Sequence, residues 1–440
     1  MLIRAIRLAD MLTAIRDAHI VTQDKFRRVI RGDVLIDGER IVSVGTRYNG
    51  SADVEIDASG DIVIPGLVNT HTHVAMSVMK GVADDLKFSD FLDKVFKVDS
   101  ERTDDDISTG TKLGCLEMIR SGTTTFTDLY YSEDVIAKAT EEAGIRGILC
   151  WCVLDEEYTT QKGNPLENCR RFCNSHKKMR KSRPGVGLQG VYVCSEDTCK
   201  GAKQLSDELK VPLHLHLSET RKEVNDHKKR TGQRPAEWLS NINVLSERTI
   251  AAHSAWVTMN EVRSMGKAKM SIASCPVSNM KLATGGVAPI PEFMSNGVNV
   301  SLGTDGSTTN NSLDMFAEMK ILGLLQKSSR WDPTVTNAQT LLDIATINGA
   351  KAIGMEKEIG SLEPGKYADI VILNGKSPDL RPLSEENIIS NIVYSASSGN
   401  VKTVLCQGDI VMKDRKITTL NERKVLDASE DAYRYLCNRK

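Results

Sequence analysis

Residues 64–73 read IPGLVNTHTH, an apolar run that ends in two histidines separated by one residue. Because side chains alternate along an extended backbone, His71 and His73 point to the same side of a strand. A second strand-length run, LHLHLSE at 213–219, carries His216 near its end. Polar residues at the carboxyl ends of buried parallel strands are typical of α/β active sites. The two runs therefore predict both a parallel β fold and the place of its site.

The chain between residues 62 and 326 alternates strand-length apolar runs with helix-length periodic segments, which is the βαβ pattern. We expect eight strands, at 62–69, 123–129, 145–154, 186–194, 212–217, 249–253, 269–274 and 299–304. The helices expected between them include 107–120, 135–143, 199–209, 221–239 and 315–326. Eight such units in about 290 residues predict a closed (β/α)₈ barrel of the α/β class. An open doubly wound sheet is the alternative, and the absence of a G-x-G-x-x-G or Walker loop disfavours it.

The two ends of the chain share a different pattern of short strands and tight turns. Asp37-Gly38 separates two strands near the N-terminus, and Gln407-Gly408 separates two near the C-terminus. Both ends together predict one small β-sandwich. The expected domains are 1–64 for its first part, 65–358 for the catalytic barrel and 359–440 for its second part. Met11 precedes the first strand, which leaves residues 1–10 as an extension or a misassigned start.

Composition excludes several classes of protein. The 440 residues include 57 basic and 58 acidic side chains, so a charge of −1 argues against a nucleic-acid partner. No apolar run approaches the roughly 18 residues of a membrane helix, and no membrane partner is expected. The ten cysteines form no framework, which indicates reduced thiols in a cytoplasmic protein.

Four polar residues occupy equivalent places at the ends of predicted strands: His71, His73, His216 and Asp305. Such strand ends meet at one end of a barrel, where three imidazoles and a carboxylate suit a divalent ion. Zn²⁺ is the first choice, with Fe²⁺ and Mn²⁺ as alternatives, because ligands of this kind discriminate poorly. His214 lies two residues deeper than His216 and is interpreted as filling the barrel. Histidines 19, 176 and 227 are interpreted as structural.

Five segments carry a resemblance to a known family: IPGLVNTHTH (64–73), HLHLSE (214–219), AAHS (251–254), SLGTDG (301–306) and GSLEPGKYAD (360–369). The chain resembles the amidohydrolase superfamily. Within it, the chain is similar to the methylthioadenosine/S-adenosylhomocysteine deaminases and the 5'-deoxyadenosine deaminases of methanogenic archaea. The resemblance implies a barrel with a β-sandwich from both termini and a hydrolytic deamination of adenosine derivatives that salvages by-products of S-adenosylmethionine.

The resemblance also implies roles for residues at the strand ends. His71, His73, His216 and Asp305 would bind the metal, and Asp305 would also accept a proton from water. Glu219 would be the acid/base group, and His253 would polarise the attacking water. Relatives with two metals carry a lysine at the end of strand four. The segment 188–194 has none, so one divalent ion per subunit is expected.

Substrate contacts depend on less specific matches. Relatives place a glutamate near residue 99 to hold the ribose hydroxyls, and Asp99 is the nearest match, with Glu101 as a rival. Gln189 stands where relatives commonly carry a histidine that donates to the purine, and its amide can also donate. Glu219 and Asp305 would contact the substrate as well. Arg170 and Arg171 lie in the region of a tail-binding arginine, although a helix surface is the favoured interpretation.

Two other functions stay open. The same scaffold could carry an aminohydrolase or chlorohydrolase for guanine, cytosine or a triazine, which need no ribose contact. A non-catalytic scaffold is the second alternative, and the complete set of four ligands argues against it. The expected partner is a small-molecule nucleoside, and the resemblance implies a homo-oligomer such as a tetramer.

Overall fold

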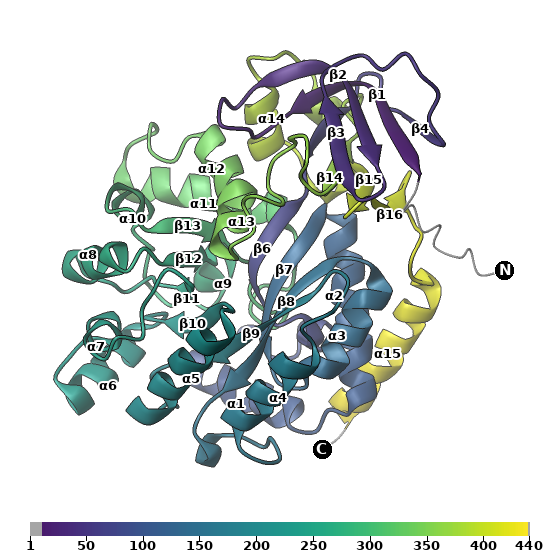
Figure 1. Ribbon diagram of the computed structural model, residues 1–440. Helices are drawn as coiled ribbons and strands as arrows, with labels where there is room; N and C mark the ends of the chain where they lie inside the picture. Colours follow the sequence, from purple (N-terminus) through teal and green to yellow (C-terminus); the bar gives the residue numbers. More distant parts are fainter. Residues whose placement is uncertain (1–10, 439–440) are drawn as a thin grey trace.

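The computed structural model describes residues 11–438, and its centre is a sheet of eight parallel strands (Figure 1). The strands run in sequence order around a nearly closed barrel: β6 (Leu67–Thr72), β7 (Thr123–Tyr130), β8 (Arg146–Val153), β9 (Arg183–Leu188), β10 (Leu213–Leu217), β11 (Thr249–His253), β12 (Ser271–Ser274) and β13 (Asn299–Leu302). The first and last strands meet where the Asp305 N–H donates to the His71 carbonyl oxygen at 3.0 Å. The predicted (β/α)₈ barrel is therefore confirmed.

Helices cover the outside of the barrel, so its strands are buried on both faces and read as continuous apolar runs. They are η1 (Val74–Met79), α1 (Phe88–Asp99), α2 (Asp104–Arg120), α3 (Glu133–Ala143), η2 (Glu156–Tyr158), α4 (Pro165–Ser175), α5 (Glu196–Leu209), α6 (Arg221–Thr231), α7 (Pro235–Asn241), α8 (Met259–Lys267), α9 (Pro276–Lys281), α10 (Ile290–Ser295), α11 (Met315–Arg330), α12 (Ala338–Ala345) and α13 (Ile347–Ala352). Thr103 and Thr258 begin α2 and α8 with capping boxes, in which two otherwise unpaired backbone N–H groups find acceptors. None of the helices within residues 11–438 has the length and apolar character that a membrane crossing requires.

The two ends of the chain form a second sheet of nine strands, as predicted. It contains β1 (Leu12–Val21), β2 (Val29–Asp37), β3 (Arg40–Val44), β4 (Val54–Asp57), β5 (Ile62–Pro65), β14 (Ile370–Leu373), β15 (Val401–Cys406), β16 (Asp409–Lys413) and β17 (Lys416–Ile417). Antiparallel pairing of β5 with β14 joins the two halves. Figure 1 shows the purple N-terminal strands beside the green and yellow C-terminal ones. Both predicted hairpins are present, as β2–β3 and β15–β16.

The C-terminal part also contains helices. They are η3 (Pro378–Leu380), α14 (Ile388–Tyr394), η4 (Ser398–Asn400) and α15 (Glu422–Asn438). Helix α15 lies against α2 (Figure 1), where Arg120 of α2 forms an ion pair with Glu422 at 2.5 Å. The domain boundaries at residues 64 and 358 stay a prediction. The interpretation of residues 1–10 concerns a segment outside the described residues.

Three predicted elements differ from the structure. The strand predicted at 62–69 is divided at Gly66, because β5 belongs to the terminal sheet and β6 to the barrel. A Cβ at Gly66 would meet the Thr124 side chain at 2.1 Å, so only glycine fits this passage. The strand predicted at 186–194 ends at Leu188. The helix predicted at 221–239 is broken, because Gly232 ends α6 with φ 79° and Pro235 begins α7.

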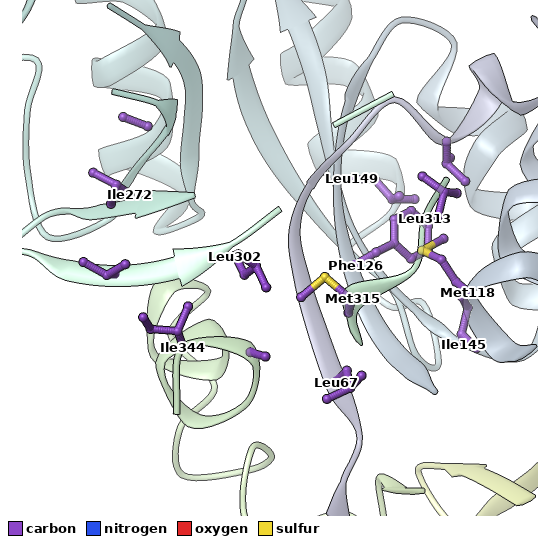
Figure 2. Packing of buried hydrophobic residues seen from close by; sticks show 14 of the residues in the cluster. Leu67, Met118, Phe126, Ile145, Leu149, Ile272, Leu302, Leu313, Met315 and Ile344 are labelled. Carbon is purple, nitrogen blue, oxygen red and sulfur yellow. The ribbon is translucent and has the colours of Figure 1, made fainter. Parts of the chain in front are cut away.

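The main hydrophobic core lies between the barrel and its helices. Figure 2 shows Phe126 and Leu149 of neighbouring strands close to Met118 of α2 and to Met315, the first residue of α11. Phe126, Leu149 and Met118 are all fully buried. Each such side chain contributes about 1.5–3 kcal/mol by leaving water. This packing makes the strand ends a rigid platform for the polar residues that follow them.

A buried ion pair joins the barrel to the terminal sheet. Arg146, the first residue of β8, donates to the carboxylate of Asp369, and both side chains are at most 2% exposed. The Arg146 Nη2 also donates to the Gln407 Oε1 at 3.1 Å. The terminal sheet therefore supplies the anion that the barrel's buried arginine needs.

Candidate active site

The predicted metal ligands lie together at the carboxyl end of the barrel, the end formed by the last residues of the strands. His71 is in β6 and His73 follows it, His216 is in β10, and Asp305 follows β13. The Asp305 Oδ1 is 3.4 Å from the His71 Nε2 and 3.3 Å from the His73 Nε2. The His73 and His216 Nε2 atoms are 3.2 Å apart. The structure thus brings together four residues that are far apart in sequence.

The hydrogen bonds of the outer ring nitrogens fix which nitrogens face the centre. The His73 Nδ1 lies 2.7 Å from the Leu129 carbonyl oxygen, and the His216 Nδ1 lies 2.7 Å from the Gln189 carbonyl oxygen. A carbonyl oxygen only accepts, so Nδ1 carries a proton in both rings, and in the neutral form of each ring Nε2 presents a lone pair to the centre. Two lone pairs that face each other at 3.2 Å repel unless a cation lies between them.

His214 sets the same arrangement for His71. The His214 Nδ1 donates to the Ile250 carbonyl oxygen at 3.0 Å, and burial lowers its pKa to about 3, so its ring is neutral. Its Nε2 therefore accepts from the His71 Nδ1 at 2.7 Å. This leaves a lone pair on the His71 Nε2, a buried atom without a hydrogen-bond partner among the described residues. His214 fills the barrel, as interpreted from the sequence, and it also orients a candidate ligand.

Asp305 completes the cluster as its only carboxylate. Burial alone would raise the pKa of Asp305, but the nearby His71, His253 and His73 side chains hold this pKa well below its usual range. The Ser278 hydroxyl donates to its Oδ2 at 2.6 Å, and the Gly306 N–H donates to its Oδ1 at 2.7 Å. Three imidazole lone pairs and an ionised carboxylate fit a divalent ion.

Glu219 and His253 face each other beside this cluster. The Glu219 Oε2 is 3.9 Å from the His253 Nε2, and the other ring nitrogen of His253 lies 2.9 Å from the Asn279 Oδ1. Burial raises the pKa of Glu219. Burial lowers the pKa of His253, but the Glu219 and Asp305 carboxylates and the Asn279 oxygen outweigh it and raise that pKa overall. Both groups therefore face each other with raised pKa values, and either can give or accept a proton.

Several residues at this end have a left-handed backbone that is unusual outside glycine. The φ angles are 49° at Ser218, 66° at His253 and 62° at Asp305. Such conformations cost about 1–3 kcal/mol each and cluster at functional sites. Here they turn the chain sharply after the strands, so that Glu219, His253 and Asp305 reach the same space.

Glu223 supports the site, although the sequence did not indicate it as a site residue. It lies half-buried in the first turn of α6 and accepts from the backbone N–H groups of Ser218 at 2.9 Å and Glu219 at 2.8 Å. It therefore holds the turn that carries Glu219. Its pairing with this turn depends on how the chain folds back after β10, which the sequence pattern does not reveal.

The structure places Asp99 in a buried polar group near the site. Its carboxylate accepts from the Tyr130 hydroxyl and from the Tyr131 hydroxyl at 2.9 Å, and it forms an ion pair with Arg102 at 2.5 Å. The Tyr130 ring lies 6.5 Å from the His73 ring. Its rival, Glu101, is exposed. Side chains of the protein itself thus already bind the Asp99 carboxylate. The residue type at position 99 alone could not show these contacts.

The other candidate substrate residues have different surroundings. Gln189 uses its backbone to hold His216, while its side-chain amide donates to the Tyr192 hydroxyl at 2.9 Å. Arg170 lies on α4 and forms an ion pair with Glu208 of α5 at 2.7 Å, which agrees with a helix surface. The structure also shows a contact of Ser278 with Asp305 and a contact of Asn279 with His253. The feature of the sequence that points to these two residues is their place shortly after the barrel strand β12.

An α/β barrel with polar residues gathered at the carboxyl ends of its strands is the architecture of the α/β-barrel enzymes. The family model described as Amidohydrolase family matches residues 62–411, and the chain belongs to this family. The chain is 42% identical over 406 residues to a 5'-deoxyadenosine deaminase of Methanothermobacter thermautotrophicus, which covers 91% of this chain and 94% of that protein. It is 38% identical to a 5-methylthioadenosine/S-adenosylhomocysteine deaminase of Pyrococcus furiosus, with 94% and 98% covered.

A solved structure has the same fold as this chain. The crystal structure of an adenosine deaminase from Xanthomonas campestris with bound zinc superposes with a TM-score of 0.92 at 27% identity. The match covers 97% of this chain and 98% of that one.

Proposed function

We propose that this protein is a hydrolase that deaminates 5'-deoxyadenosine and related adenosine derivatives, including 5'-methylthioadenosine, S-adenosylhomocysteine and adenosine. The products would be the inosine analogues and ammonia. The observation that carries the proposal is the convergence of three imidazole lone pairs and the Asp305 carboxylate beside Glu219. The names of the similar proteins support the same substrate class.

His71, His73, His216 and Asp305 would hold one divalent ion. When bound, such an ion lowers the pKa of a water molecule towards neutrality. Zn²⁺ is proposed first because the adenosine deaminase of similar structure has bound zinc, and Fe²⁺ or Mn²⁺ could use the same donors. One ion per chain is proposed because the segment 188–194 has no lysine that could join a second.

The chain's own residues would carry out the proton transfers of the reaction. In the reaction, water adds to C6 of the purine, the bond from C6 to the exocyclic nitrogen breaks, and ammonia leaves. Asp305 would accept a proton from the water, and His253 would orient that water. Glu219, whose pKa is raised by burial, would hold a proton at the ring nitrogen and pass protons to the departing ammonia. Protons are conserved, because those removed from water end on the products.

Substrate contacts from Asp99 and Gln189 are also proposed. Asp99 would exchange one tyrosine hydroxyl for a ribose hydroxyl, since its carboxylate already accepts from Tyr130 and Tyr131. Replacement of Asp99 by Asn is expected to raise KM for nucleosides more than it lowers kcat. An equal KM for both proteins would remove Asp99 from the ribose site.

Ammonia release from a panel of substrates tests the function. Protein incubated with Zn²⁺ is given 5'-deoxyadenosine, 5'-methylthioadenosine, S-adenosylhomocysteine and adenosine beside guanine, cytosine and a chlorinated triazine, for which chloride release is measured as well. We expect release from the adenosine derivatives and none from the free bases. Turnover of a free base or triazine alone would favour the alternative hydrolase. No bound metal and no turnover would favour a non-catalytic scaffold.

The cellular setting belongs to the same proposal: a cytoplasmic homo-oligomer, such as a tetramer, that salvages by-products of S-adenosylmethionine. All ten cysteines are free thiols, and nine of them are buried, which suits a reducing compartment. Trp331 is 95% exposed and follows α11, on which Leu324 is 47% exposed. Exposed large apolar side chains of this kind support a subunit interface. Light scattering after size exclusion would give the number of subunits.

A further inference from the structure

A cavity of about 610 Å³ lies at the amino end of the barrel, the end formed by the first residues of the strands. Its walls include the first residues of β8 and β9 and the segments that lead into β10 and β11. Tyr367 and Gln407 close it from the side of the terminal sheet. Strands of about five residues rise roughly 16 Å, so this cavity is separate from the candidate active site at the carboxyl end.

Basic residues predominate in the lining of the cavity although the whole chain is nearly neutral. Its lining contains one acidic residue, Glu247, against eight basic ones: Arg146, Lys177, Arg180, Lys181, Arg183, Lys210, Arg248 and Lys351. The segment KKMRKSR at 177–183 supplies four of the eight. The balanced totals of the sequence hide this concentration, because the fold gathers the residues from five separate segments.

Five of the eight cations have structural partners. Arg146 pairs with Asp369, Arg183 with Glu358 and Arg248 with Asp207. Arg180 and Lys181 both pair with Asp409, at 2.6 and 3.0 Å. Four of these five pairs connect the barrel to residues 358–409, and the fifth connects Arg248, the residue before β11, to α5. Stability of the fold therefore explains these five residues.

Lys177, Lys210 and Lys351 have no such explanation. All three are exposed, and within residues 11–438 no carboxylate lies within 4.0 Å of their ammonium groups. They come from three different segments, so their arrangement around one cavity is a product of the fold. Like charges around a concave surface repel each other and focus the field on its interior. An anion in the cavity would relieve this repulsion.

We propose that this cavity binds a small polyphosphate anion, of the class of the nucleoside polyphosphates. Lysine ammonium groups are strong phosphate binders, and the half-exposed Arg183 and Arg248 guanidinium groups can add charge-assisted hydrogen bonds. The volume of about 610 Å³ lies within the usual range of small-molecule sites, roughly 300–1,000 Å³. The apolar side chains of Pro184, Val211 and Ile353 also line the cavity and offer a surface for a base.

Calorimetric titration of the metal-loaded full chain tests the site. The ligands are ATP, as its magnesium complex, and inorganic triphosphate, with uncharged adenosine for comparison. The test variant is K177A/K210A/K351A. The matched control is K138A/K267A/K320A, which removes three exposed lysines on the outer faces of α3, α8 and α11. Thermal melting checks that both variants are folded.

We expect wild type and control to bind ATP and triphosphate alike, and the test variant to bind them at least tenfold more weakly. Binding should weaken as salt rises, because exposed charges are screened. Turnover without added anion should be the same in all three proteins. The calorimetric binding result does not depend on the proposed deaminase activity, so the two proposals can fail separately. Absence of binding to wild type, equal binding by test variant and control, or displacement of bound ATP by adenosine would overturn the proposal.

Discussion

The two ends of the barrel hold their buried polar groups in opposite ways. At the amino end, the buried Arg146 and Lys181 have carboxylates from the terminal sheet as partners. At the carboxyl end, the rings of His71, His73 and His216 aim lone pairs at one point. No lysine or arginine side chain reaches them in the described part of the chain. The buried cations of the first end are therefore paired within the chain, whereas the imidazoles of the second end suit an external cation.

Replacement of Asp305 by Ala should have the largest effect at the carboxyl end. It removes the only anion among the four candidate ligands, so both bound metal and turnover should fall to background. Replacement of Ser278 by Ala removes only the hydroxyl that donates to Asp305 and should lower activity much less. Metal analysis and ammonia release measure both effects. A variant that keeps its metal and its rate would contradict the ligand assignment.

Replacement of Glu219 by Gln separates chemistry from metal binding. It removes the acid/base group but no ligand, so kcat should fall by roughly 10²–10⁴ while metal content stays unchanged. Glu237→Gln, at an exposed position on α7, serves as the control with a rate near wild type. Near-normal turnover of Glu219→Gln would remove this residue from its proposed role.

Replacement of Arg146 by Met should affect stability at the amino end. It leaves Asp369 buried without its cation, which typically costs about 3–5 kcal/mol in the free energy of unfolding. Arg183→Met breaks a half-exposed pair with Glu358 and should cost about 0–1 kcal/mol. Denaturant titration gives both values. If the two variants were equally stable, the buried pair would not be what joins the sheet to the barrel.

Replacement of His214 by Leu is expected to have the smallest effect of the four. It removes the acceptor that orients His71, and the loss of such a partner typically weakens metal binding by roughly 10–100-fold. His227→Leu replaces another buried histidine, which lies on α6 and packs on Trp238 of α7, and should keep its metal affinity. Competition with a chelator measures both. Equal affinities would reduce His214 to a space-filling role.

The sequence predicted the parts of this molecule that depend on local pattern. Alternating apolar runs located the barrel strands, and the strand ends located His71, His216 and Asp305. Contacts between distant segments were not accessible in this way. The two tyrosine partners of Asp99 come from β7 and the residue after it, and the acceptor for His71 comes from β10. The cavity at the amino end combines residues from segments more than 200 positions apart, and no local pattern reports such a cluster.

Metal titration of stripped protein tests the central claim most directly. Chelated protein is reloaded with increasing Zn²⁺, and ammonia release from 5'-deoxyadenosine is measured against bound metal. We predict no turnover in the stripped protein and a linear rise that saturates at one ion per chain. Full turnover without metal, or saturation only at two ions, would contradict a single centre held by His71, His73, His216 and Asp305.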